Sequence, residues 1–270
     1  IPEPVTRDTC RQISAFCLNH QTGHGGRPGI IPRQLYWLRN YPAGRLFRVG
    51  RFEYMLSRYA HAGPVVRRGT LTLAFADPSF WVSGDGRTIV DEPAAENGFK
   101  PDLAVDDTVI AGYPIEPNGV VRSERIRLDR SEWETVLEDD DPVLDMHIPA
   151  GGGMRPELVR RSMADAFEFF DAYFPDSPAR AVVCRSWIFN TQVEERIPDG
   201  NLAAFMRAAY LVPARSSGRD GMFFVFCRDY DTVADYPRDT RLRRALLEIL
   251  EAGDRLRTTG MFFLRDDLHR

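Results

Sequence analysis

The sequence lacks several features that would direct the protein to a membrane, a nucleic acid or a structural metal. It contains no apolar run of the roughly 20 residues that cross a bilayer, and no signal-peptide pattern at its start. The formal net charge of −4 provides no basic field for nucleic acid. The four cysteines form no C-x-x-C pair, which argues against a metal site and makes a reduced, cytoplasmic compartment the default expectation.

Two common phosphate-binding signatures are missing as well, but a related arrangement is present. There is no Gly-Lys-Ser/Thr, and no G-x-G-x-x-G followed by an acidic residue on the next strand. Instead, three consecutive glycines at 151–153 stand between a predicted strand and a predicted helix that opens with Pro156. Glycines permit positive φ angles and leave the amides accessible, and a helix N-terminus favours an anion. The segment indicates either a phosphate or pyrophosphate site or a tight turn without a ligand.

Hydrophobic periodicity predicts a chain that is helical at its start, rich in strands in its middle, and alternating between strands and helices at its end. Helices are predicted over 1–20, 32–40, 129–137, 156–174, 191–209 (interrupted near 198–200) and 240–252. Strands are predicted over 46–56, 70–75, 80–82, 109–115, 120–128, 143–148, 181–189, 210–214, 222–227 and 260–264. This order predicts an α/β (α+β) fold in which a mixed sheet carries helices on both faces.

Several motifs resemble, in the same order, those of a bacterial acyltransferase family in which a helical N-acyltransferase segment precedes a GNAT-like C-terminal domain. The residues that carry the resemblance are Gly44-Arg-Leu-Phe-Arg-Val-Gly-Arg-Phe-Glu53, Gly112-Tyr-Pro-Ile115 with Asn118-Gly119, Trp133-Glu-Thr-Val-Leu137, Val143-Leu-Asp-Met-His-Ile-Pro149, Ser162, Ala166–Phe170, Phe174-Pro175, Cys184-Arg-Ser-Trp187 and Asp239-Thr240. They cover nearly the whole chain.

The resemblance implies a GNAT-like fold: a mixed, mostly antiparallel sheet with helices on both faces and a short helical N-terminal segment. Residues 1–43 are then expected to end a larger helical N-terminal region, and residues 44–270 to form the acyltransferase domain. The resemblance also implies acyl-CoA as co-substrate, a small-molecule amine as acceptor, and no metal. An acyl carrier protein that bears phosphopantetheine is the alternative donor.

By the same resemblance, the glycine turn contacts the pyrophosphate of CoA. The GNAT motif at this place is Arg/Gln-x-x-Gly-x-Gly/Ala, and here the leading arginine or glutamine is absent. The strands over 143–148 and 181–189 are expected to diverge and bracket the thioester. The residues expected to contact CoA are Ile148, Gly151, Gly152, Gly153, Met154 and Arg155.

Direct attack by an amine requires a base for the amine proton, a donor for the carbonyl oxygen, and a proton source for the leaving thiolate. His147 is the first candidate base, because a reference pKa of ~6.5 lets it accept a proton at neutral pH and it ends the strand before the glycine turn. Asp145 shares its strand face, and either orients the ring or is itself the base. The structural alternative is a histidine that only ends the strand.

Three further residues are candidates for the remaining roles. Cys184 and Ser186 share one face of the next strand; Ser186 is a candidate donor to the thioester, and Cys184 a candidate nucleophile for a two-step transfer. Packing explains Cys184 better, because no cation on its face of the strand would lower the thiol pKa. Tyr210 is the candidate acid for the thiolate, a role that tyrosine often has in GNAT enzymes.

These observations favour acyl transfer from a CoA-type thioester to an amine. One alternative is a non-catalytic module that binds or senses acyl-CoA, which would bind the donor tightly and transfer nothing. A third hypothesis is a hydrolase that uses Ser186 or Cys184 with His147. The absence of a G-x-S-x-G nucleophile elbow argues against the hydrolase.

Overall fold

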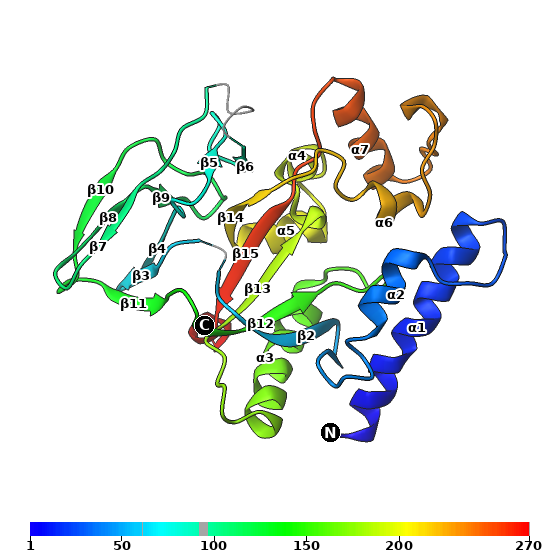
Figure 1. Cartoon of the computed structure of the whole chain (residues 1–270), viewed down its shortest axis with the longest axis horizontal. Helices are drawn as coiled ribbons and strands as arrows, with labels where there is room; N and C mark the ends of the chain where they lie inside the picture. Colours follow the sequence, from blue (N-terminus) through cyan, green and yellow to red (C-terminus); the bar gives the residue numbers. More distant parts are fainter. Residues whose placement is uncertain (61, 92–96, 270) are drawn as a thin grey trace.

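The computed structural model describes residues 1–60, 62–91 and 97–269, and its centre is a mixed sheet of eight strands (Figure 1). All neighbouring strands in this sheet are antiparallel except the pairs β12–β13 and β14–β6. In spatial order its strands are β1 (Phe47–Val49), β2 (Phe52–Arg58), β12 (Pro142–His147), β13 (Ala181–Ser186), β15 (Thr259–Leu264), β14 (Tyr210–Arg215), β6 (Thr88–Val90) and β5 (Trp81–Val82).

Two smaller antiparallel sheets form a separate lobe, at the left of Figure 1. One contains β10 (Ile126–Asp129), β8 (Val109–Gly112) and β7 (Leu103–Val105). The other contains β11 (Glu134–Leu137), β3 (Val65–Arg68), β4 (Leu71–Phe75) and β9 (Pro114–Ile115). Buried side chains of this lobe, such as Val65 and Ala74, pack in one cluster with Val143 and Val183 of the main sheet.

Helices cover both faces of the main sheet. The helices are α1 (Glu3–Gly23), α2 (Pro32–Leu38), α3 (Pro156–Tyr173), α4 (Thr191–Arg196), α5 (Asn201–Ala208), α6 (Met222–Phe226) and α7 (Arg241–Glu251), with 3-10 turns η2 (Trp187–Phe189), η3 (Val233–Asp235) and η4 (Arg265–His269). Helices α3 and α5 pack on the face that carries Leu144, while α1 and α2 pack near Met55 on the opposite face. None of the helices described is long and apolar enough to cross a bilayer.

Helix α3 holds the glycine turn in position. The sequence determines where this helix begins, and packing determines which of its faces is buried. Pro156 occupies the first helical turn, where a missing N–H costs nothing, and the helix ends before Pro175. Its buried face repeats at helical spacing and packs under β12 and β13, and each large apolar side chain contributes roughly 1.5–3 kcal/mol. The buried residues are Val159, Ser162, Met163, Ala166, Phe167, Phe169 and Phe170.

Ser162 connects helix α3 to the β1–β2 hairpin through hydrogen bonds. Its hydroxyl donates to the carbonyl oxygen of Val49 at 2.6 Å and accepts from the amide of Phe52 at 3.2 Å. Because the serine proton is used on Val49, the hydroxyl of Tyr54 donates to Ser162 at 2.9 Å. Three buried polar groups from the hairpin are thus satisfied by one side chain of α3.

The structure contains three strands that the sequence did not predict, β3, β6 and β7, and it also differs in the type of several predicted elements. Residues 46–56 form the hairpin β1–β2 rather than one strand, with Gly50 at φ +62° in the turn. The predicted helix over 129–137 is wrong: Asp129 accepts two hydrogen bonds from Ser131 in a turn, and strand β11 follows. The predicted strand over 222–227 is wrong as well, since this segment is helix α6.

Candidate functional site

The glycine turn has the free main-chain donors that an anion site requires. Gly151, Gly152 and Gly153 have φ angles of +81°, +74° and +65°, a run of left-handed backbone that other residues rarely adopt. Among the described residues, no protein group accepts a hydrogen bond from the main-chain N–H groups of residues 151–155. These N–H groups, next to the N-terminus of α3, can therefore bind an anion.

Arg51, from the turn between β1 and β2, supplies a positive charge beside the glycines. Its side chain donates to the carbonyl oxygens of Gly153 at 2.6 Å and Pro149 at 3.0 Å. It is 9% exposed, and no described acidic side chain forms an ion pair with it. Burial, reinforced by the nearby Arg48, lowers the pKa of Arg51 below its ordinary value. An anion at the turn would relieve this uncompensated charge. The arginine beside the glycines therefore comes from the β1–β2 turn and not from the segment that leads into the glycine turn.

Strands β12 and β13 separate beside the turn. Their parallel register pairs Val143 with Ala181 and ends at Asp145 with Val183, as far as the described residues show. β12 continues to His147 along β2, and β13 continues to Ser186 along β15. In Figure 1 the two strands start together and diverge, β12 toward α2 and β13 toward α5. The expected divergence of these strands is confirmed, and it leaves strand edges without mutual hydrogen bonds.

His147 and Asp145 lie together at this divergence. The imidazole Nε2 is 3.6 Å from a carboxylate oxygen of Asp145, and the two side chains are 28% and 29% exposed. Burial disfavours the charged form of each group, which lowers the pKa of His147 to about 4 and raises the pKa of Asp145 to about 7. His147 Nε2 has no hydrogen-bond partner among the described residues, and Trp37 of α2 packs edge-on against the ring at 4.6 Å. The free Nε2 can accept a proton, and its lowered pKa makes it a weaker base than the reference value of ~6.5 predicts.

Glu53 belongs to the same group of side chains. It pairs with His147 across the antiparallel β2–β12 register, so both side chains point to the same face. It is 2% exposed, and Tyr41 donates to its Oε2 at 2.9 Å. Burial raises the pKa of Glu53 to about 7. Neither Arg51 nor Glu53 was identified as a site residue from the sequence, although both lie in the quoted motif 44–53.

Cys184 and Ser186 lie on the opposite face of β13 from Asp145. In the parallel pair, Asp145 is opposite Val183, so Cys184 and Ser186 point toward the α3 side. Cys184 is 3% exposed, and burial raises its thiol pKa well above the ordinary range, which disfavours a reactive thiolate. The hydroxyl of Ser186 accepts from the amide of Ile188 at 3.4 Å and caps η2. The structure thus does not bring these residues together with His147.

Tyr210 shares the sheet face of Asp145 but lies on β14, beyond β13 and β15. Its hydroxyl donates to the carbonyl oxygen of Ile115 and accepts from the amide of Ala74 at 3.2 Å, which ties the main sheet to the β-lobe. Burial raises the pKa of Tyr210 to about 12. The Tyr210 hydroxyl thus donates one hydrogen bond and accepts another within the protein, which is a structural role.

The remaining residues expected to contact CoA have different environments. Met154 is 6% exposed and packs in the core with α3, so only its backbone faces the turn. Ile148 is partly buried against the same cluster. Arg155 is exposed at the N-cap of α3, and its side chain has no hydrogen bond or ion pair to another described residue. Arg155 is therefore free to reach an anion at the turn.

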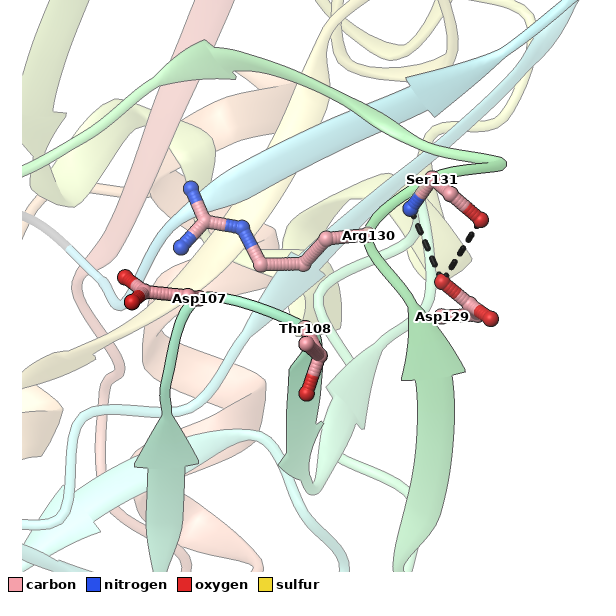
Figure 2. Close-up of a pocket in the computed structure, with 5 residues that line it drawn as sticks. All are labelled: Asp107, Thr108, Asp129, Arg130 and Ser131. Atoms are coloured by element: carbon pink, nitrogen blue, oxygen red, sulfur yellow. Dashed lines mark hydrogen bonds between the residues drawn. The ribbon is translucent and has the colours of Figure 1, made fainter.

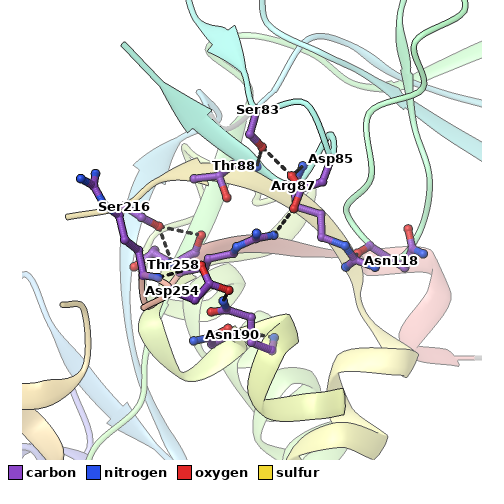
Figure 3. A network of polar contacts seen from close by, with 12 residues as sticks. Ser83, Asp85, Arg87, Thr88, Asn118, Asn190, Ser216, Asp254 and Thr258 are labelled. Carbon is purple, nitrogen blue, oxygen red and sulfur yellow. Dashed lines mark hydrogen bonds and ion pairs between the residues drawn. The ribbon is translucent and has the colours of Figure 1, made fainter. Parts of the chain in front are cut away.

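Two other polar regions of the surface lie apart from this site. A hollow of about 420 Å³ lies in the lobe formed by the two smaller sheets. Figure 2 shows Asp129 and Ser131, which line it, hydrogen-bonded to each other. Figure 3 shows a polar network that includes Ser83 and Asp85. Asp85 accepts from Ser83 at 2.6 Å and also pairs with Arg257, which precedes β15. Because this network joins the β5–β6 turn to the segment before β15 within the main sheet, its polar groups serve the fold. No three described His, Cys, Asp or Glu residues converge as metal ligands.

Comparisons with solved structures support the fold. The chain is similar to an acyltransferase in complex with decanoyl-CoA and teicoplanin, with 19% identity and a TM-score of 0.63, covering 98% of this chain and 59% of that one. The same values relate it to an acyltransferase mutant in complex with octanoyl-CoA. A third structure, with CoA and 10C-teicoplanin, has 18% identity and a TM-score of 0.61, with the same coverage.

The chain thus spans less than two thirds of the length of these acyltransferases, and identities of this size establish the fold alone. A sequence comparison with curated proteins finds no significant match. The family comparison covers most of the chain, from residue 46 to residue 263, and includes the glycine turn and the strands that diverge beside it. On this evidence the chain belongs to the family of the GNAT-like C-terminal domain.

Proposed function

We propose that this protein transfers an acyl group from acyl-CoA to an amine. One observation supports this most: free amides and an unpaired arginine at the glycine turn lie beside diverging strands, with His147 at the opening. The amides of residues 151–155, together with Arg51 and Arg155, bind the diphosphate of CoA. The pantetheine arm then lies between β12 and β13, where its amide groups can use the unpaired strand edges.

His147 is the base in this proposal. Its Nε2 takes a proton from the acceptor ammonium, and the amine nitrogen then bonds to the thioester carbonyl carbon. As the tetrahedral intermediate collapses, the C–S bond breaks, the nitrogen releases its second proton to solvent, and CoA leaves as a thiolate that takes the first proton back from the imidazolium. Asp145, 3.6 Å from Nε2, stabilises the imidazolium while it exists.

Calorimetry and mass spectrometry test the two parts of this function separately. The protein is titrated with CoA, acetyl-CoA, octanoyl-CoA and decanoyl-CoA, and then incubated with a panel of amines that includes teicoplanin, the compound present in one of the similar structures. We expect a donor to bind and an acyl-amine product to form. If neither a CoA thioester nor an acyl carrier protein binds, the donor assignment is wrong.

The His147→Ala variant tests the base. We expect turnover to fall by 10²-fold or more while donor affinity changes less than threefold, since general acid–base catalysis contributes on the order of 10²–10⁴-fold. Unchanged turnover in this variant would show that His147 is not the base and has only a structural role. Donor binding without transfer to any amine would instead favour a sensing module.

A further inference from the structure

Two residues that are neighbours on the face that carries His147 each have a buried polar atom without a hydrogen-bond partner among the described residues. Among the described residues, neither Oε1 of Glu53 nor Nε2 of His147 has a hydrogen-bond partner. The residues are directly paired in the β2–β12 register, which places their Cβ atoms about 4.5–5.5 Å apart on one side of the sheet. Buried polar atoms are nearly always satisfied, so an unsatisfied pair of this kind indicates a ligand group with hydrogens to donate.

The charges in this region identify the kind of donor. Glu53 and Asp145 are both acidic, and neither forms an ion pair with a described arginine. Within the described part of the chain, His147 is the one group at ion-pair distance from Asp145, and its burial favours the neutral form. A cation is therefore the complementary ligand. An organic cation fits better than a metal ion, because no three described His, Cys, Asp or Glu residues converge to coordinate one.

Access and rigidity agree with a binding role. The side chains of His147 and Asp145 are more than a quarter exposed, whereas Glu53 and the Nε2 atom of His147 are buried, and Tyr41 fixes Oε2 of Glu53. This leaves Oε1 as the free oxygen of a carboxylate that cannot rotate away without losing the bond to Tyr41. The raised pKa of Glu53 is the response expected of a buried carboxyl without a cation, and a bound cation would reverse it.

We propose that Glu53 and His147 form the subsite that receives the acceptor as a protonated primary amine, with Glu53 pairing with its positive charge. This inference rests on the proposed acyl transfer, and it adds the residue that recognises the acceptor. The ammonium donates one N–H to Oε1 of Glu53 and another to Nε2 of His147. The second hydrogen bond is the one along which the proton moves to the base.

Binding of n-butylammonium to the CoA-loaded protein tests this subsite without requiring turnover. Calorimetry at neutral pH compares n-butylammonium with n-butanol, which has the same chain and no charge, on the wild-type protein. The same titration is made on Glu53→Gln, which keeps an oxygen for Tyr41, and on Glu134→Gln, an exposed control on β11. Thermal unfolding and CoA affinity check that each variant is folded.

We expect the wild type and Glu134→Gln to bind n-butylammonium alike, and at least tenfold more tightly than n-butanol. We expect Glu53→Gln to bind n-butylammonium at least tenfold more weakly, with CoA affinity unchanged. Equal binding of n-butylammonium and n-butanol by the wild type, or equal binding of n-butylammonium by the wild type and folded Glu53→Gln, overturns the subsite. Failure of CoA to bind overturns the proposed donor instead, and the comparison of the two ligands on the CoA-free protein still decides the role of Glu53.

Discussion

Substitution of one glycine of the turn separates backbone strain from phosphate binding. Gly152 and Gly253, the latter just after α7, have similar φ angles of +74° and +79°. A Cβ atom on Gly152 would lie 3.1 Å from both Cδ and Nε of Arg51, whereas one on Gly253 meets nothing within 4 Å. Gly152→Ala and Gly253→Ala therefore share the cost of left-handed backbone, about 1–2 kcal/mol each. Only the first also displaces Arg51.

The displacement has a predictable size. A contact of 3.1 Å forces the guanidinium to move by a few tenths of an ångström, which lengthens its bonds to the carbonyl oxygens of Gly153 and Pro149. Hydrogen bonds that involve a charged group contribute about 1.5–3 kcal/mol. Loss of one such contact to the diphosphate corresponds to a decrease of about 10–100-fold in CoA affinity.

Urea unfolding and calorimetric titration with CoA measure the two quantities. We expect Gly253→Ala to lose about 1–2 kcal/mol of unfolding free energy, Gly152→Ala to lose at least as much, and only Gly152→Ala to lose CoA affinity. If Gly152→Ala binds CoA as tightly as Gly253→Ala and the wild type, Arg51 and the glycine turn are not the phosphate site.

Three further predictions follow from buried polar groups. Ser162→Ala leaves three hairpin groups unsatisfied, so urea unfolding should show a loss of about 2–4 kcal/mol. Tyr210→Phe should cost about 1–3 kcal/mol by the same assay, while the turnover of the folded fraction stays within twofold of wild type; a large loss of turnover would restore Tyr210 as the acid. For Glu53, a folded pKa of about 7 exceeds the unfolded value near 4.5, so its contribution to stability is complete below pH 4.5 and is lost as pH rises through 7. The unfolding free energy of wild type relative to Glu53→Gln should therefore fall by up to about 3 kcal/mol over that range, and a flat difference would contradict a buried, unpaired carboxyl.

The sequence predicted the parts of the fold in which the local residue pattern is compatible with only one type of secondary structure. The strand before the glycines and helix α3 after them follow from an apolar run, a glycine turn, Pro156 and Pro175. The failures have local causes too. The run Met222–Phe226 is short and apolar, which fits a buried strand or a helix equally well. Gly221 and Cys227, at its two ends, have positive φ angles that limit the segment to a short helix. The sequence does not show these backbone conformations.

The candidate site was predictable where it lies on one strand and unpredictable where it depends on register. His147 and Asp145 share a face because strand side chains alternate, so their proximity could be anticipated. The position of Cys184 relative to them depends on which residue of β13 lies opposite Asp145, and a shift of one residue would exchange the faces. Arg51 and Glu53 were missed for the same reason, since β2 lies about ninety residues before β12 in the chain.

The turn before β2 and the start of β2 place opposite charges at the two parts of the proposed site. Arg51 and Glu53 are two positions apart, yet the first reaches the carbonyl oxygens of the glycine turn and the second faces His147. In the proposed reaction a polyanionic donor transfers a neutral acyl group to a cationic acceptor, so the enzyme must present opposite charges to the two substrates over a short distance. The segment from Arg51 to Glu53 meets that requirement. Antiparallel pairing of β2 with β12 places this segment beside both the glycine turn and His147. Reversing the charges in Arg51→Glu/Glu53→Arg should therefore weaken CoA and n-butylammonium binding together, whereas each single substitution, Arg51→Gln or Glu53→Gln, should weaken only its own ligand by calorimetry. Loss of both ligands in either single variant would show that this segment is structural rather than the source of these opposite charges.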